Sequence, residues 1–335
     1  MLIKTAARHG MNTMGTNIEK ELTKAYRILE EGKIAEARDV LSNAYDYTIA
    51  GPEDSSKTNS EITFAHWCCS YWADFVQNLP RLDAYEQGDG LMARWKAFKC
   101  DYEAKENHQQ KVIYAIQQGI FTLALNAYNS ARYESARGDD TTPQKSDLLR
   151  KKGLCLKKLG KYEEALNLLT EAYSISPQSS PILAEMADCF ALCGEEKNAK
   201  VLFREAFFLD ASRIEIEFLD SELICCLIRR VREKGYTGPE LHEWIPVYGV
   251  VYGVFNVKRE LRVQEPGRLR QEIFAKENEI KDPANNSKTL VPKLINMYFW
   301  LIDHYARSNE GKEKINECLL QIRVHDENIY RMYTR

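Results

Sequence analysis

The sequence predicts an all-α protein made of stacked helical hairpins, and two observations support this fold class. Apolar residues recur three and four positions apart over segments too long for strands, which is typical of amphipathic helices. A stretch that begins at residue 148, LLRKKGLCLKKLGKYEEALNLLTEAYSISP, is followed 34 residues later by a similar one, ILAEMADCFALCGEEKNAKVLFREAFFLDA. A repeat of this length must stack on a neighbour, because one hairpin cannot bury both of its faces.

Polar breaks divide the helical segments at 50–60 (AGPEDSSKTNS), 134–146 (ESARGDDTTPQKS) and 281–288 (KDPANNSK). Each break mixes Pro, Gly, Ser, Asn or Asp, the residues that favour loops. Between the breaks, the apolar spacing predicts helices near 18–31, 35–48, 60–79, 90–105, 108–133, 146–159, 163–175, 180–193, 197–209, 214–234, 246–262, 266–279, 290–307 and 312–323.

The 34-residue period has a physical explanation in the packing of two helices. Gly160 and Gly194 lie at equivalent positions and supply the backbone freedom that a tight helix–helix turn needs. Where the two helices of a hairpin would cross, both repeats have small residues at equivalent positions. Around the crossing, both repeats have large residues at equivalent positions. The first set is Leu149, Gly153, Leu156, Gly160, Ala165, Leu169, Ala172 and Pro177, and its counterparts are Leu183, Ala187, Phe190, Gly194, Ala199, Phe203, Ala206 and Ala211.

This pattern resembles the tetratricopeptide repeat (TPR) at residues 146–179 and 180–213. The resemblance implies a right-handed α-solenoid of helical hairpins, here interrupted by irregular longer helices. Weaker echoes occur at 18–51 and 105–138, and near Gly311. The expected organisation is therefore a flexible N-terminus (1–17), an N-terminal helical region with degenerate TPR-like hairpins (18–133), two TPR repeats (146–213), and an irregular C-terminal helical region with a possible degenerate final repeat (214–335).

The resemblance also implies a partner-binding groove, because the first helix of each TPR hairpin lines a concave surface. By family position, the groove would contain Arg150, Leu154, Lys157, Lys158, Ala184, Asp188 and Ala191. Leu154 and Asp188 stand where a carboxylate-binding TPR clamp uses Asn, which disfavours recognition of a peptide C-terminus. The basic side chains could still attract an acidic or extended segment, or could simply be solvated.

Two unusual segments fall outside the clear repeats. The region 61–103 holds His66, Trp67, Tyr71, Trp72, Phe75 and Trp95, which we interpret as an aromatic core or solenoid cap, with a ligand pocket as the alternative. The stretch WIPVYGVVYGVFNV (244–257) can be a strand or a helix. We favour a helix with Pro246 in its first turn, in which Gly249 and Gly253 let another helix come close. Its apolar arc would comprise Val247, Val250, Val251, Val254, Phe255 and Leu261.

The cysteines do not indicate disulfides or metal. Nine is an odd count, and the adjacent pairs at 68–69 and 225–226 rarely belong to a disulfide framework, so we expect reduced, buried thiols. Cys189 and Cys193 share a helical face, and His66 lies near the first pair, but neither has the C-x2-C spacing of structural zinc sites. No metal or cofactor is expected.

Catalytic motifs are also missing from the sequence. GDGLMA (88–93) fits the dinucleotide fingerprint in letters only, because no strand precedes it. A net charge of −3 gives no overall basic field for nucleic acid or an anionic membrane. The first residues, MLIKTAARHGMNTMGTN, lack the apolar segment of a signal peptide, and no apolar run approaches the roughly 20 residues of a membrane span, so we expect a cytoplasmic protein.

The sequence therefore predicts a non-enzymatic scaffold or adaptor that grips a protein or peptide partner on the concave face of a TPR superhelix. Self-association is possible, and nucleic acid is an unlikely partner. The alternative is a regulator that binds a small ligand or nucleic acid through the irregular regions 61–133 or 235–280.

Overall fold

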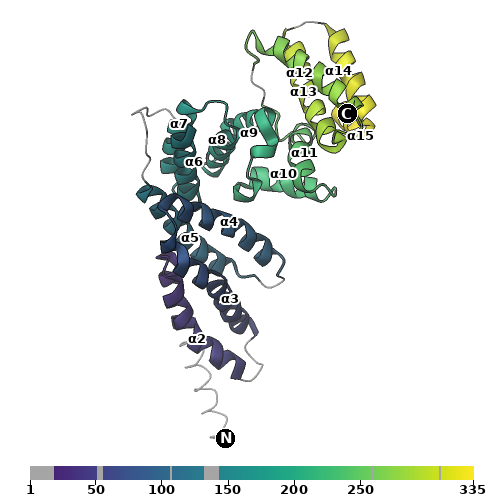
Figure 1. Ribbon diagram of the computed structural model, residues 1–335. Coiled ribbons are helices and arrows are strands. Elements are labelled where there is room, and N and C mark those ends of the chain that lie inside the picture. The colour runs from purple at the N-terminus through teal and green to yellow at the C-terminus, as the bar shows by residue number, and fades with distance from the viewer. Residues whose placement is uncertain (1–18, 51–55, 106–107, 132–142, 258–259, 309–310) are drawn as a thin grey trace, which may run out of the picture. The chain divides into compact units, whose positions relative to one another are not determined.

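The computed structural model describes residues 19–50, 56–105, 108–131, 143–257, 260–308 and 311–335. All regular secondary structure in these ranges is helical, which confirms the predicted all-α fold class (Figure 1). The chain divides into two compact units, Met1–Ala165 and Leu166–Arg335. Among the described residues, no helix is long and apolar enough to cross a membrane.

The first unit begins with a helix at residues 19–30. It continues with α2 (Ile34–Ala50), α3 (Ser56–Asn78), the 3₁₀ turn η1 (Leu79–Arg81), α4 (Ala84–Glu103), α5 (Gln110–Ser130) and α6 (Pro143–Lys158). The unit boundary falls within α7 (Tyr162–Ile175).

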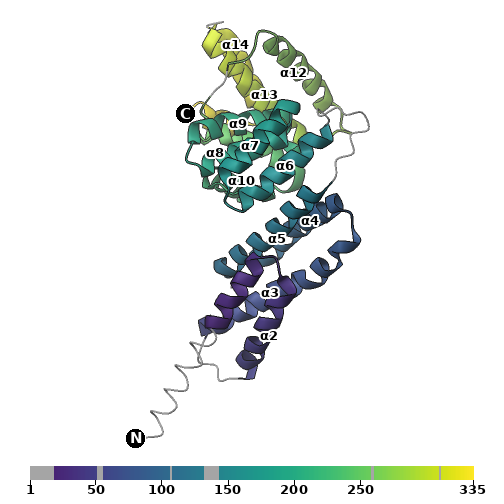
Figure 2. The same ribbon diagram turned by 90° about the vertical axis from the view of Figure 1, so that its left-hand side faces the viewer.

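After α7, the second unit contains both helices of the 180–213 repeat and then the irregular helices of the C-terminal region. Its elements are α8 (Ser180–Leu192), α9 (Glu196–Asp210), the 3₁₀ turns η2 (Ala211–Arg213) and η3 (Ile216–Phe218), α10 (Glu222–Arg232), α11 (Gly238–Val251), α12 (Glu265–Lys281), α13 (Ser287–Ser308), α14 (Lys312–His325) and α15 (Glu327–Tyr333). In this unit α13 packs against both α12 and α14 (Figures 1 and 2). The sequence did not predict α15, and the segment predicted as one helix at 214–234 is a 3₁₀ turn followed by the shorter α10.

Three glycines end helices in the same way. Gly32, Gly160 and Gly194 have positive φ angles of 79°, 78° and 84°, a conformation that favours glycine. In each case the glycine N–H donates to the carbonyl three residues earlier, and the following N–H donates to the carbonyl five residues before it. This pair of bonds is the Schellman motif, which satisfies the last carbonyl groups of the helix. The predicted turns at Gly160 and Gly194 are therefore confirmed.

The first unit packs α5 directly onto the turn at Gly32. Gly119 lies in the middle of α5, and a Cβ added there would be 2.0 Å from the carbonyl oxygen of Leu29. Because α5 runs unbroken from Gln110 to Ser130, the spacing at 105–138 does not mark a hairpin turn at Gly119. That glycine is required for a close approach between helices.

An aromatic cluster fills the first unit between α3, α4 and α5. Trp72, Trp95 and Phe98 are at most 2% exposed. The Trp95 ring lies 5.5 Å from that of Phe98 and 5.0 Å from that of Phe121 on α5, measured between ring centroids. Trp72 and Trp95 therefore belong to the core of this unit, as interpreted from the sequence, whereas His66, Trp67, Tyr71 and Phe75 are partly exposed.

The GDGLMA motif lies inside helix α4, which rules out a dinucleotide-binding turn after a strand. Its first glycine has a packing function, because a Cβ on Gly88 would meet the ring of Tyr128 at 2.4 Å. The Tyr128 hydroxyl donates to Asp89, which also accepts from the Lys151 ammonium at 2.8 Å. Lys151 in turn donates to Tyr85, so a polar network joins α4, α5 and α6.

The stretch 244–257 is helical in its first half, but its helix differs from the prediction. Helix α11 begins at Gly238, with Pro239 in its first turn, and Pro246 lies in its interior. Gly253, at a φ of 72°, follows the end of the helix, so the predicted continuation to 262 is wrong. The chain folds back instead, and the Phe255 N–H donates to the carbonyl of Gly249 at 2.9 Å. The Phe255 ring, and not another helix, occupies the space beside Gly249.

A buried ion pair joins α9 to α13 within the second unit. The Arg204 guanidinium donates to the Asp303 carboxylate, and both residues are buried, at 3% and 6% exposed. The same guanidinium lies over the Trp300 ring, with 4.9 Å between its central carbon and the ring centroid. The pair lies in the large apolar core that this unit builds from α8 to α15.

The two contrasting environments of Gly119 and Gly267 give a stability prediction. Gly119→Ala should lower the free energy of unfolding by about 1–3 kcal/mol or more, because the added methyl group collides with backbone. Gly267→Ala in α12 should raise it by about 0.5–1 kcal/mol, because nothing lies within 4 Å and Ala favours helix. Urea unfolding followed by circular dichroism measures both, and equal effects of the two substitutions would contradict the packing of α5 on Leu29.

The Arg204–Asp303 pair gives a second prediction. Arg204→Met should cost about 3–5 kcal/mol of stability, because it removes the cation that pairs with the buried Asp303 carboxylate. The double variant Arg204→Met/Asp303→Leu should recover most of that loss, since apolar residues can replace a buried pair at little cost. Arg331→Met is the control, because Arg331 and Glu327 pair at 2.9 Å while more than half exposed, and its cost should stay below about 1 kcal/mol. Additive losses in the double variant would disprove the coupling.

Candidate functional site

The repeat at 180–213 forms a close-packed hairpin of α8 and α9. Ala187 on α8 and Ala199 and Phe203 on α9 are fully buried, and α8 and α9 are in extensive contact. Small side chains at the crossing let the two helices approach, and Phe203 fills the space beside them. The sequence period predicted this arrangement of small and large residues.

The predicted groove residues offer little surface to a partner. Arg150, Leu154, Lys157 and Lys158 lie on α6 in the first unit, and Ala184, Asp188 and Ala191 lie on α8 in the second. Only Ala191 is partly exposed, and the others are buried. The Arg150 guanidinium pairs with Asp147 at 3.0 Å, one turn earlier on the same helix.

Asp188 binds the chain's own backbone. It is fully buried, and its carboxylate accepts hydrogen bonds from the N–H groups of Asp220, at 2.9 Å, and Ser221, at 2.8 Å. These N–H groups directly precede α10, where a negative charge also interacts favourably with the helix dipole. Asp188 therefore fixes the start of α10 against α8. No sequence pattern indicates these two bonds, which join residues 32 and 33 positions apart.

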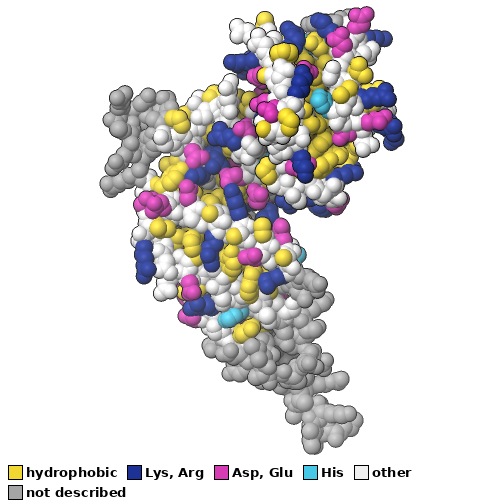
Figure 3. All heavy atoms as spheres, turned by 45° about the vertical axis from the view of Figure 1, so that its right-hand side comes forward, with side chains coloured by type: hydrophobic (Ala, Val, Ile, Leu, Met, Phe, Trp, Pro, Cys, Tyr) yellow, Lys and Arg dark blue, Asp and Glu magenta, His cyan; other side chains and the backbone are white. Residues whose placement is uncertain are grey.

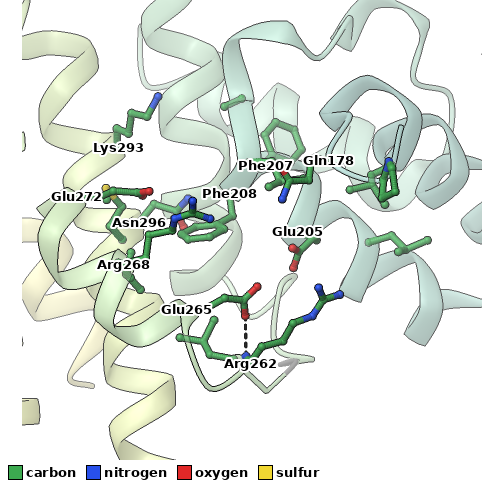
Figure 4. A pocket seen from close by; sticks show the side chains of 18 of the residues that line it. Gln178, Glu205, Phe207, Phe208, Arg262, Glu265, Arg268, Glu272, Lys293 and Asn296 are labelled. Carbon is green, nitrogen blue, oxygen red and sulfur yellow. Dashed lines mark hydrogen bonds between the residues drawn. The ribbon is translucent and has the colours of Figure 1, made fainter. Parts of the chain in front are cut away.

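A groove in the second unit offers a more accessible concave surface. It has a volume of about 740 Å³ and lies among α7, α9, α11, α12 and α13, and we call it the α9–α12 groove. Figure 4 shows Arg268, Glu272 and Asn296 on one side and Gln178 and Glu205 on the other. This volume is within the range of about 300–1,000 Å³ that is usual for ligand sites.

Apolar side chains form much of the groove wall. Tyr173, Leu202 and Phe208 are partly exposed there, and Phe208 is held by Trp300, with 4.3 Å between their ring centroids. At the rim, the Arg262 backbone N–H donates to Glu265 at 2.7 Å, which Figure 4 marks with a dashed line. The Arg262 and Arg268 side chains make no hydrogen bond or ion pair with other residues that the structure describes.

Two buried polar side chains of the groove lack partners. Glu243 on α11 is 7% exposed and Asn296 on α13 is 5% exposed, and neither side chain forms a hydrogen bond or ion pair within the described ranges. Burial raises the pKa of Glu243 to about 7, helped by the charge of Asp210 and opposed by Lys293 and Lys276. The sequence had placed the first of these residues in the irregular region 235–280, but no motif or spacing identified either of them.

Positive and negative side chains are interspersed over both units on the face that Figure 3 shows. The nine cysteines are free thiols; Cys68, Cys69, Cys155, Cys189 and Cys318 are buried, and Cys100 and Cys193 are exposed. The expectation of uniformly buried thiols therefore holds only for part of the set. Cys189 lies within α8, whereas the exposed Cys193 directly follows the end of that helix.

Comparison with known proteins agrees with the repeat geometry. Residues 156–213 match the family model described as tetratricopeptide repeat, a range that includes all of α8 and α9 and the turns at Gly160 and Gly194. No curated protein and no solved structure matches the chain. The matched range, the period and the two Schellman turns together confirm a tetratricopeptide repeat segment at residues 156–213.

Proposed function

We propose that the chain is a non-enzymatic scaffold or adaptor that binds a protein partner. The observation that carries this proposal is the TPR match at 156–213, because such repeats generally mediate protein–protein interaction. Repeat units that stack side by side present long surfaces rather than one closed catalytic cavity. We expect the partner to be a protein or a peptide segment, and we keep the cytoplasm as the predicted location.

The concave face of the repeats is our proposed partner-binding surface, with a limited role for its predicted residues. Lys157, Lys158 and Asp188 are buried, so their side chains support the fold rather than meet a partner directly. Ala191 is the partly exposed member of the set and marks where a partner would pass α8. The clamp chemistry that the sequence disfavoured stays disfavoured, because Asp188 already binds the backbone before α10.

The alternative proposal is a regulator that binds a small ligand through region 235–280. The α9–α12 groove favours it, because Glu243 and residues of α12 line an open space with unpartnered polar groups. Region 61–133 supports it less, since its largest aromatic residues, Trp72 and Trp95, pack into the core of the first unit. The interspersed charges in Figure 3 do not favour nucleic acid, which requires a basic surface.

Affinity capture with the full chain tests the scaffold proposal. We expect specific partners to be retained from lysate of the native cells, quantified by mass spectrometry. Ala191→Arg should release them, because a long charged side chain would obstruct the face of α8. Ala97→Arg is the matched control on the exposed face of α4 and should retain them. Circular dichroism must show that both variants fold.

Each result decides one part of the proposal. Retention of the same partners by Ala191→Arg would disprove the concave-face assignment and leave the scaffold role standing. Absence of any specific partner would disprove the scaffold role. Reversal of the charges on Arg150, Lys157 and Lys158 would not discriminate, because charge reversal at buried positions should unfold the protein.

A further inference from the structure

The α9–α12 groove contains polar groups that the protein leaves unsatisfied. A buried carboxyl and a buried amide normally have hydrogen-bond partners, because burial without them is costly. Glu243 and Asn296 are both more than nine-tenths buried, both line the groove, and neither has a partner in the described part of the chain. Groups of this kind, open to a cavity, are typical of a site whose missing partner is a ligand.

The groups around Glu243 do not supply the missing donor. Lys293 on α13 and Lys276 on α12 affect its carboxyl through their charge, but neither forms an ion pair with it. The Lys276 ammonium donates to Glu279 instead. Asp210 on α9 adds a further negative charge nearby. No described residue therefore donates a hydrogen bond to the Glu243 carboxyl, and a donor with positive charge would match it.

The walls suit a long side chain with a charged end. Tyr173, Leu202 and Phe208 provide apolar and aromatic surface along the groove. Lysine and arginine bury their methylene stems on such surface, and their charged ends also interact favourably with aromatic rings. Arg262 and Arg268, whose guanidinium groups are unpaired among the described residues, would attract acidic residues beside that side chain.

We propose that the α9–α12 groove binds a segment of a partner protein whose lysine or arginine side chain enters the groove and donates to Glu243 and Asn296. Acidic residues next to that side chain contact Arg262 and Arg268. The inference rests on the proposed scaffold function and names a second surface through which it acts. It also explains why Glu243 and Asn296 are polar at buried positions.

The pH dependence of binding reports the sign of the ligand's charge. A cationic side chain binds the ionised form of Glu243, whose pKa is about 7 without the ligand. At pH 6 the cation must first displace the proton of Glu243, which weakens binding, whereas at pH 8 the carboxylate is already ionised. Affinity should therefore rise from about pH 6 to about pH 8. An anionic ligand would favour the protonated carboxyl and would show the opposite trend.

The test uses a random peptide library displayed on phage and selected on the full chain. Selected peptides without histidine are synthesised, and fluorescence anisotropy gives their dissociation constants at about pH 6 and pH 8. The same peptides are measured with Gln in place of the basic residue. The protein variants are Glu243→Gln and, as a matched control, Glu313→Gln on the exposed first turn of α14. Free L-arginine serves as the small-molecule competitor.

We expect the selected peptides to share a lysine or arginine. Glu243→Gln, or Gln in place of that basic residue, should weaken binding at least roughly tenfold, and the two changes together should weaken it little further. Glu313→Gln should leave binding unchanged, and the pH dependence should disappear in Glu243→Gln.

Several outcomes would overturn the inference. These are an empty selection, peptides that share no basic residue, an unchanged affinity in Glu243→Gln, or tighter binding at the lower pH. Free L-arginine that binds as tightly as the peptides would assign the groove to a small cation instead. Peptides that bind equally well to Glu243→Gln would remove the groove but keep the scaffold function, whereas the capture experiment tests that function separately.

Discussion

The second unit depends on the ion pair between Arg204 and Asp303. Arg204 belongs to the second helix of a repeat, and Asp303 belongs to the irregular C-terminal helices, so this pair ties a standard element to the part of the chain that departs from the family pattern. Pairing offsets part of the cost of removing two charges from water. Their geometry also fixes Trp300, which lies under the guanidinium and holds Phe208 at the groove wall. One pair thereby connects the repeat to the groove.

Three buried carboxylates of this unit show how differently a charge can be accommodated. Asp303 has a cation, and Asp188 has the two backbone N–H groups before α10. Glu243 has neither, and burial moves its pKa toward neutrality. Asp303 and Asp188 are accounted for by these structural contacts. The third is a site where the fold alone does not account for the residue, and this contrast carries the inference about the groove.

The sequence predicted the helical fold and the two clear repeats because these follow from local patterns. Apolar residues three and four positions apart define one face of a helix. Gly160 and Gly194 can adopt the positive φ that ends a helix in a tight turn. The extent of α11 could not be predicted from the sequence. Pro246 lies inside the helix, and the role of Gly249 becomes clear only because the chain folds back and places the Phe255 ring beside it. Asp188 and Glu243 could not be assigned either, since their environments are made by helices distant in sequence. The family position of Asp188 indicated a groove, but tertiary contacts decide its role.

The three Schellman turns differ in what selects their glycine. Nothing lies within 4 Å of a Cβ placed on Gly160 or Gly194, so only the handedness of the backbone opposes a larger residue there. Asparagine, which tolerates the left-handed conformation, could replace either glycine at modest cost. At Gly32 the same Cβ would also meet Leu123 at 2.9 Å, so both conformation and space require glycine. The repeat turns are therefore constrained by backbone conformation alone, whereas the turn at Gly32 is also constrained by the side chain packed against it.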